Sequence, residues 1–152
     1  MSLWFVFISG AFCGLVGAFA MTFFMACVSS AYGKRVDMTL ALGSYFIRTT
    51  DGAVIVGRLI HAVSGLVFGV AYFAIMHAMG ALVFPYAIFL GLGFGFFHGL
   101  LMSYMLMFYA SERHPIDDYR KATLEEGLLH LVGHLIFGGV TGLLGALVTL
   151  IL

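Results

Sequence analysis

Long stretches of this chain carry no charged residue. Every Lys, Arg, Asp and Glu lies either between Lys34 and Arg58 or between Glu112 and Glu126. The stretches outside these two clusters are strongly apolar, and each is near or above the ~20 residues that a helix needs to cross ~30 Å of hydrocarbon. This pattern predicts several helices that span a membrane.

The chain as a whole is too apolar for a water-soluble domain. Of its 152 residues, 62% are hydrophobic and only 9% are charged, whereas a soluble domain has about 25% charged residues. With so few charges the protein could not cover its surface in water, so we expect the lipid bilayer to be its immediate partner. The formal net charge of zero gives no basis for nucleic-acid binding.

We expect an all-α, polytopic membrane protein in which residues 1–152 form a single four-helix transmembrane domain. The expected spans are about 3–28, 53–79, 86–109 and 124–151, arranged as two helical hairpins. The charged loops 29–52 and 110–123 then lie on the same side of the membrane. All seven Lys and Arg residues flank that side, so the positive-inside rule predicts cytoplasmic loops and external N- and C-termini.

Local signals predict how the spans are connected. The middle of the first loop is too apolar for a free loop, and Asp37 is placed to cap a short helix lying in the membrane interface. The connection 80–85 is short and uncharged, which predicts a tight antiparallel hairpin between the second and third spans. Thr123 and Glu126 fit a capping box that opens the last span.

Two spans share a pattern of one histidine followed by two glycines, each four residues apart. The residues are His61, Gly65 and Gly69 in the second span, and His134, Gly138 and Gly142 in the fourth. Residues four apart share a face of a helix. Together with a match of Gly14 to Gly95, the pattern indicates an internal repeat of two parallel hairpins, with a pseudo-twofold axis along the membrane normal.

Such a repeat would make His61 and His134 face each other across the axis. At 1.5 Å per residue, both lie roughly 12 Å from the charged end of their helices, and His98 lies roughly 17 Å from it. Two facing imidazoles suit the axial positions of a b-type haem, with glycines below them for the flat macrocycle. Those glycines are Gly65, Gly69, Gly138 and Gly142. This interpretation predicts a small membrane redox protein.

A transition-metal ion is the alternative ligand for the same histidines. Imidazole and carboxylate groups that suit Zn, Fe or Cu come from His130, His134, His61 and Glu126. The spacing matches neither H-E-x-x-H nor the Glu-x-x-His of di-iron bundles. Glu126 equally suits its capping role, and the histidines equally suit a structural role as neutral, hydrogen-bonded side chains.

Transport and catalysis have less support in the sequence. A carrier typically has a broken helix near the midplane and a charged residue deep in a span, and no carboxylate lies at that depth here. A small transporter is therefore the second alternative. There is no nucleophile elbow and no pairing of serine with histidine, so we assign no catalytic residue and do not expect an enzyme.

The leading interpretation is a non-catalytic accessory or assembly subunit of a larger redox or photosynthetic membrane complex. The chain has almost no mass outside the membrane and contains twenty glycines. Small residues let helices pack closely where the hydrophobic effect does not drive association. We therefore expect other membrane-protein subunits as partners.

Two features of the sequence indicate a resemblance to a known group of proteins. They are the glycine-rich first span with its Met21-Thr22 pair and the H-x-x-x-G-x-x-x-G pattern of the second span. The chain resembles small bacterial four-helix integral membrane proteins of unknown function. The resemblance touches both halves of the chain and implies a bacterial inner membrane. It implies no substrate, cofactor or catalytic residue.

Overall fold

The structure, a computed structural model, describes residues 2–32 and 38–151 and confirms the all-α fold class. Four helices are long and apolar enough to cross a membrane. They are α1 (Leu3–Tyr32), α3 (Ala53–Ala78), α4 (Tyr86–Met105), which continues through the π-helical turn η1 (Leu106–Ala110), and α5 (Leu124–Ile151). By the length and composition of these helices, the chain is an integral membrane protein.

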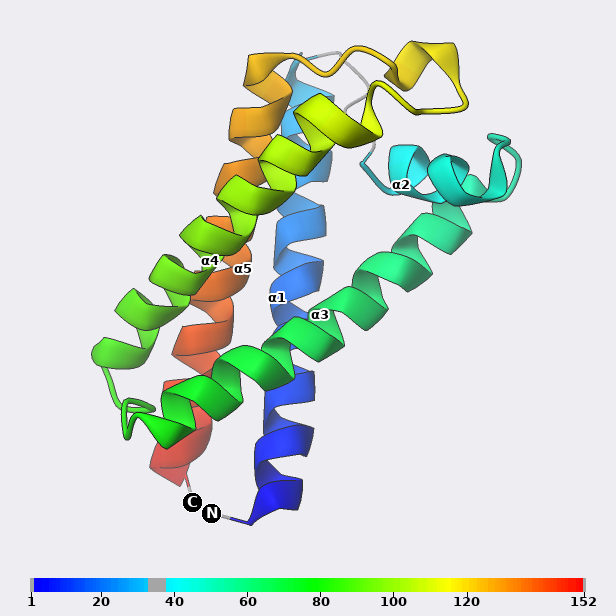
Figure 1. The fold of residues 1–152 in the computed structure, drawn as a ribbon. Coiled ribbons are helices and arrows are strands. Elements are labelled where there is room, and N and C mark those ends of the chain that lie inside the picture. The colour runs from blue at the N-terminus through cyan, green and yellow to red at the C-terminus, as the bar shows by residue number, and fades with distance from the viewer. Residues whose placement is uncertain (1, 33–37, 152) are drawn as a thin grey trace.

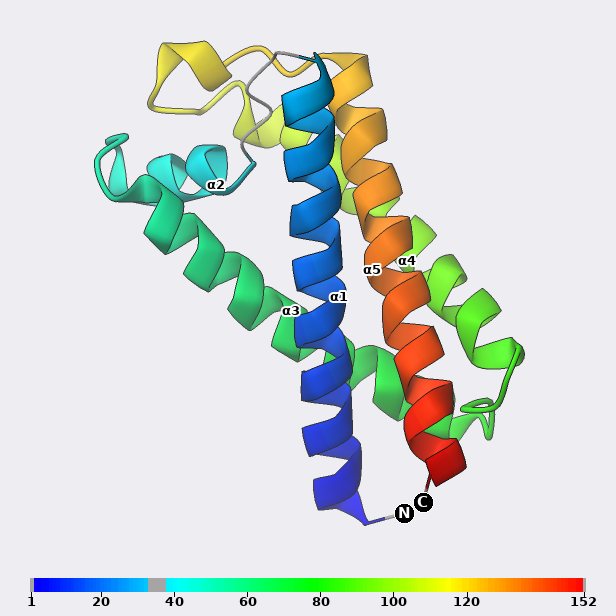
Figure 2. The same ribbon diagram turned by 180° about the vertical axis from the view of Figure 1, so that it is seen from behind.

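The four spans pack as two pairs joined by one central contact. α3 crosses α1 obliquely and packs against it, α4 packs against α5, and α1 packs against α5 (Figures 1 and 2). The backbones of α3 and α4 approach each other little, because α3 runs obliquely away from α4, and side chains make most of the contact between them. The short connection predicted between the second and third spans is present, at residues 79–85, but the two helices diverge from it and their backbones do not pack as a close hairpin. The ring of Tyr72 on α3 contacts the rings of Phe94 and His98 on α4 in the space between the two helices.

Glycine backbones form the contact between α1 and α3. A Cβ atom added at Gly14 would collide with the carbonyl oxygen of Gly65 and the backbone of Gly69, and one added at Gly10 would lie 2.8 Å from the Cα atom of Val70. With no side chains in between, the two backbones make dispersion and Cα–H···O contacts, which drive helix association in lipid.

The contact between α4 and α5 is also formed by glycine backbones. A Cβ atom added at Gly138 would collide with the carbonyl oxygen of Gly91 and lie 3.0 Å from the Cα atom of Gly95. One added at Gly142 would collide with the carbonyl oxygen of Ala87. The two helix pairs are therefore held by equivalent glycine interfaces.

The two interfaces differ in register from the repeat predicted from the sequence. Gly69 packs against Gly14, and Gly138 packs against Gly95, so the structure matches Gly69 with Gly138. The sequence alignment matched Gly69 with Gly142, one helical turn away. The halves are also not symmetric, because the backbones of α1 and α5 pack closely whereas those of α3 and α4 do not.

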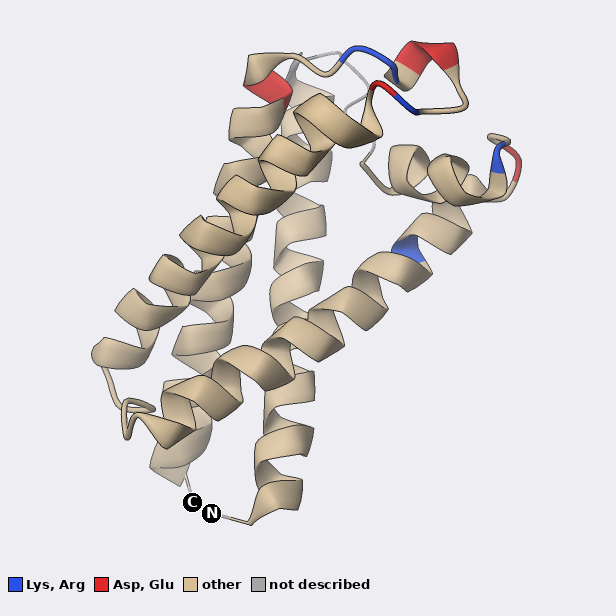
Figure 3. Cartoon of the chain, viewed as in Figure 1, with Lys and Arg blue, Asp and Glu red and all other residues tan. Residues whose placement is uncertain are grey.

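A short helix and both loops cover one end of the bundle. α2 (Met38–Ile47) runs across the start of α3 (Figure 1), where a Cβ atom added at Gly57 would collide with the carbonyl oxygen of Thr39. The position of α2 agrees with the expected short helix, while its predicted cap, Asp37, lies outside the described residues. The second loop carries the 3₁₀ helix η2 (Asp117–Tyr119). The described charged residues gather at this end, opposite the termini (Figure 3).

His114 ties the second loop to α2. It is buried, and the backbone N–H of Ile116 donates to its Nδ1 atom at 3.1 Å. Its Nε2 atom therefore carries the proton and donates to the carbonyl oxygen of Ala41 at 3.0 Å. The rings of Tyr45 and Tyr119 enclose the imidazole. The loop is thus fixed to α2 by a hydrogen bond inside an aromatic contact.

Candidate functional site

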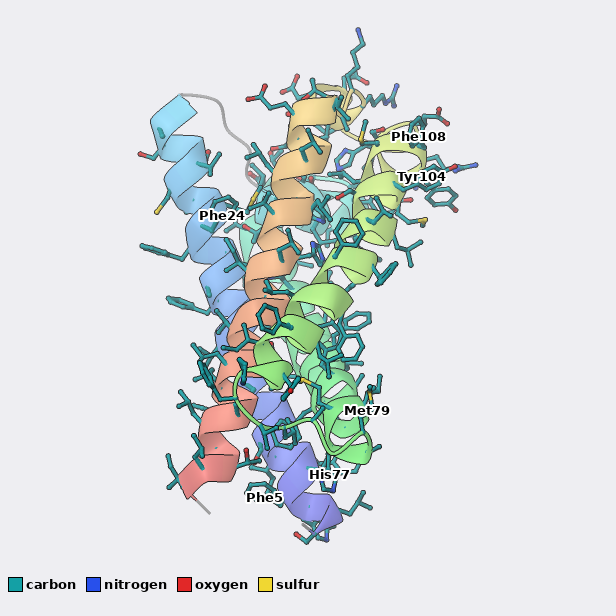
Figure 4. The ribbon with its side chains drawn as sticks, turned by 90° about the vertical axis from the view of Figure 1, so that its left-hand side faces the viewer. Phe5, Phe24, His77, Met79, Tyr104 and Phe108 are labelled. Carbon is teal, nitrogen blue, oxygen red and sulfur yellow. The ribbon has the colours of Figure 1, made fainter. Side chains whose placement is uncertain are left out.

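Four histidines from three helices form a cluster toward the charged end of the bundle. The ring centroid of His134 lies 4.7 Å from that of His98 and 4.7 Å from that of His130. His61 is close enough to His130 and His134 for electrostatic interaction. The structure therefore brings together all four histidines predicted as ligands. His77, in contrast, lies near the termini (Figure 4).

The glycine interface between α4 and α5 places two of these imidazoles side by side. A Cβ atom added at Gly95 would collide with the carbonyl oxygen of His134, and one added at Gly99 would lie 2.6 Å from the Cβ atom of His134. His98 immediately precedes Gly99, so its ring meets that of His134 across the interface. On its other side, the His98 ring packs against Phe68 of α3, with centroids 4.0 Å apart.

Hydrogen bonds assign the tautomers of His61 and His134. Thr22 donates its hydroxyl hydrogen to the carbonyl oxygen of Ala18 at 2.9 Å. The 3.1 Å contact between Thr22 Oγ1 and His61 Nδ1 is therefore a bond donated by the imidazole. His134 Nδ1 likewise donates to the carbonyl oxygen of His130 at 2.9 Å. In both rings the proton is on Nδ1, so Nε2 keeps a free lone pair.

His130 and His98 differ in their tautomers. His130 Nδ1 lies 2.8 Å from the sulfur of Met38. A thioether has no hydrogen to donate, so Nε2 of His130 also keeps its lone pair. The hydroxyl of Tyr72 lies 3.1 Å from His98 Nδ1 and has no other partner among the described residues, so it donates and leaves the His98 proton on Nε2. The cluster thus offers three lone pairs and one N–H donor.

Metal sites use imidazoles held by a hydrogen bond at the second ring nitrogen, as these are. Here, however, the rings are not arranged to coordinate one ion together. Metal-ligating histidines usually donate their second N–H to a carbonyl or similar acceptor. Within residues 2–32 and 38–151, no group of three or more His, Cys, Asp or Glu side chains is spaced to hold a metal ion. The carboxylate of Glu126 accepts from the backbone N–H of Thr123 at 2.7 Å and completes the capping box. The structure therefore uses Glu126 as a cap.

The four glycines assigned to a macrocycle line helix interfaces. Gly65 and Gly69 face α1, and Gly138 and Gly142 face α4. A Cβ atom added at Gly65 would already lie 2.6 Å from the Cβ atom of Ala18. Because neighbouring helix backbones fill these faces, they offer no surface on which a haem could lie.

A cavity of about 570 Å³ lies beside the cluster, between α1, α2 and the first turns of α3. Its described lining includes three methionines, several hydroxyl groups, one arginine and one histidine. Met21, Met25 and Met38 form what we term the methionine wall, and Arg58 and His61 belong to the part contributed by α3. Met21 and Met38 also contact α5, so they lie between the cavity and the α5 part of the histidine cluster, while His61 lines the cavity itself.

Sequence reasoning missed Tyr72, Met38 and the cavity itself. No local pattern marks Tyr72 as the partner of a histidine 26 residues away. Met38 reaches the cluster only because α2 folds across α3. The four-residue spacing of Met21 and Met25 was the one available signal for the cavity, because it places both thioethers on one side of α1.

No protein-family model, curated protein or solved structure matches this chain. The resemblance to small bacterial four-helix membrane proteins therefore stays a prediction that rests on the first two spans. The structure identifies the chain as an all-α integral membrane protein with four bilayer-length helices and a cluster of four histidines inside the bundle.

Proposed function

We propose that this protein is a small membrane redox subunit that holds a soft transition-metal ion through its histidine cluster. The observation that supports this function is a set of three imidazoles, those of His61, His130 and His134. Each donates Nδ1–H to a fixed acceptor and keeps a free Nε2 lone pair. Imidazole and thioether donors together suit copper, and the sulfur of Met38 already contacts His130.

The residues around the metal would have distinct roles. His61, His130 and His134 donate the lone pairs, while Thr22 and the backbone carbonyl of His130 orient the rings and raise their basicity as ligands. No three donors are spaced for coordination in the chain as described, so binding requires small helix shifts that bring the three Nε2 atoms together while the Nδ1–H bonds persist. The bound ion would supply the one-electron chemistry, and the apolar helices would tune its reduction potential.

Metal content of the purified full chain tests this function. We expect about one copper or iron ion per chain, and the double variant His61→Ala/His134→Ala should lose it. His77→Ala is the control, because His77 lies at the other end of the bundle (Figure 4) and should leave the metal content unchanged. A chain that takes up neither Cu(I) nor Fe(II), or a double variant that binds like the wild type, would overturn the proposal.

An accessory or assembly subunit is the second candidate function, and the outer face of α1 supports it. Large apolar side chains, three or four residues apart, form one exposed ridge along this helix. They are Trp4, Ile8, Phe12, Leu15, Phe19 and Phe23. Neither α3 nor α5 covers the ridge, which suits packing against a helix of a larger redox or photosynthetic complex.

Co-purification from native membranes tests the second candidate. We expect larger membrane subunits to elute with the wild type in mild detergent and to be lost from Phe12→Ala/Phe19→Ala. Phe97→Ala on α4 removes an equally exposed ring, 72% accessible, outside the ridge and should keep the partners. Elution of the wild type alone would contradict this function.

We also infer that the charged end faces the cytoplasm of a bacterial inner membrane. The described Lys and Arg residues gather at that end, and both termini lie at the other (Figure 3), which the positive-inside rule orients with loops inside. A reporter enzyme that folds only outside the cytoplasm should be active when fused to the C-terminus. Activity of a fusion in the second loop instead would reverse the assignment.

A further inference from the structure

We propose that the cavity between α1, α2 and α3 binds an anionic amphiphile. Its carboxylate or phosphate group would meet the guanidinium of Arg58, and its apolar body would lie along the methionine wall. This site is separate from the proposed metal ligands, except that His61 and Met38 border both.

The charge of Arg58 supports an anionic ligand. Arg58 is the only charged residue in the described lining of the cavity, and it has no ion pair or hydrogen bond among the described residues. It lies five residues after the first residue of α3, roughly 8 Å along the helix. A guanidinium that has no counter-ion within residues 2–32 and 38–151, next to an apolar wall, favours a carboxylate or phosphate that it can bind in bidentate fashion. The hydroxyl of Ser30 borders the same cavity.

The opposite wall supports an apolar body for the ligand. Met21 and Met25 are almost fully buried, and with Met38 they present thioether side chains to the cavity. Methionine is unbranched and flexible, so such a wall can adapt to an alkyl chain. The volume, about 570 Å³, falls within the ~300–1,000 Å³ typical of small-molecule sites and is far larger than an ion needs.

The position of the cavity indicates that its ligand comes from the membrane. α2 lies across the start of α3 beside the cavity, at the end of the bundle where the charged residues gather (Figures 1 and 3). Anionic head groups lie at this level of a bilayer, where they are attracted to basic side chains. An amphiphile in the leaflet could therefore place its head group at Arg58 and its chain against the methionines without crossing water.

Binding to purified full-length protein in an uncharged detergent tests the proposal. Oleate, phosphatidylglycerol and inorganic phosphate are titrated separately, with native mass spectrometry for stoichiometry and thermal unfolding for affinity. We expect about one amphiphile per chain and at least a roughly tenfold loss of affinity in Arg58→Gln. Arg48→Gln is the matched control, since Arg48 is exposed near the same end but does not line the cavity.

A second variant tests the cavity independently of charge. Ala26→Phe puts a ring into the lining while leaving Arg58 in place, and it should abolish amphiphile binding without changing far-ultraviolet circular dichroism. Binding of oleate but not phosphatidylglycerol would identify a free carboxylate as the ligand group, and binding of both would identify lipid head groups as well. Wild-type affinity in both variants, equal binding of oleylamine, or equal binding of inorganic phosphate alone would overturn the proposal.

Discussion

The α1–α3 and α4–α5 interfaces are both built from glycine backbones, but they differ in their contacts toward the charged end of the bundle. Between α1 and α3, the hydrogen bond between Thr22 and His61 lies at the cavity, which both residues line and which separates the two helices there. Between α4 and α5, the Ser103 hydroxyl donates to the carbonyl oxygen of Gly127 at 2.8 Å, so the helices stay in contact toward the charged end. Glycine therefore determines how closely two helices approach, while the residues beyond the glycines determine whether a cavity opens.

α2 lies where the two interfaces differ. A Cβ atom added at Gly43 would collide with the carbonyl oxygen of Ala53, so α2 holds the start of α3 through a backbone contact of its own. α2 thus lies on the first turns of α3, where α3 runs obliquely away from α1 and the cavity opens (Figure 1). At the corresponding end of the other pair, the side chain of Met107 packs directly on Gly127 and fills the space between α4 and α5.

The largest expected effect comes from breaking the first interface. Gly14→Ala places a methyl group against the backbone of Gly65, which cannot move without separating α1 from α3. We expect a loss of about 1–3 kcal/mol in the free energy of unfolding, measured by denaturant titration in detergent micelles. Gly93→Ala is the control, because a Cβ atom there meets nothing within 4 Å. It should stabilise the helix by up to ~1 kcal/mol. Equal effects of the two substitutions would contradict the interface.

The hydrogen bonds that end the two interfaces sharpen the comparison. Thr22→Val leaves the Nδ1–H of His61 without its acceptor, and Ser103→Ala removes the bond to Gly127. Each should lower the free energy of unfolding by about 1 kcal/mol. Only Thr22→Val should also weaken metal binding, by about 10–100-fold, because it frees a ligand ring to rotate. A comparable loss of metal affinity in Ser103→Ala would mean that general loosening of the bundle causes it.

The spans were predictable because their signal is local. Length and apolar composition placed four helices, and the T-x-x-E pattern of Thr123 and Glu126 gave the capping box that the structure contains. The histidine cluster was partly predictable, since four-residue spacing puts His130 and His134 on one face. The hydrogen bond from Tyr72 to His98 was not predictable, because it depends on how α3 crosses the bundle.

The register of the repeat and the position of the cavity could not be predicted from the sequence. Sequence similarity aligned the histidine-glycine patterns, whereas packing aligned the points at which backbones touch, and these differ by one turn at Gly69 and Gly138. Nothing local to Arg58 shows that α2 will lie on the first turns of α3 where the cavity opens. Contacts between distant segments decide both features.

The capping box of α5 allows a test with a smaller expected effect, which separates the role of Glu126 in stability from a role in metal binding. Glu126→Ala removes the carboxylate that accepts from the backbone N–H of Thr123 and should lower the free energy of unfolding by about 1 kcal/mol. Metal content should not change, because Glu126 acts as a cap at the start of α5. Glu125→Ala, which changes an exposed neighbour with no capping bond, serves as the reference. Loss of metal together with stability in Glu126→Ala would restore the carboxylate to the ligand set.

The smallest effect on the free energy of unfolding is expected in the second loop, where side chains are exposed to water. Arg120 pairs with Asp117 at 3.1 Å, but the carboxylate side chain is 87% exposed. Water screens such a pair, so Asp117→Asn should change the free energy of unfolding by less than ~0.5 kcal/mol. His114 would still hold the loop on α2 through Ala41. A change as large as that of Gly14→Ala would mean that the charged loop, and not close packing of glycine backbones, sets the stability of this bundle.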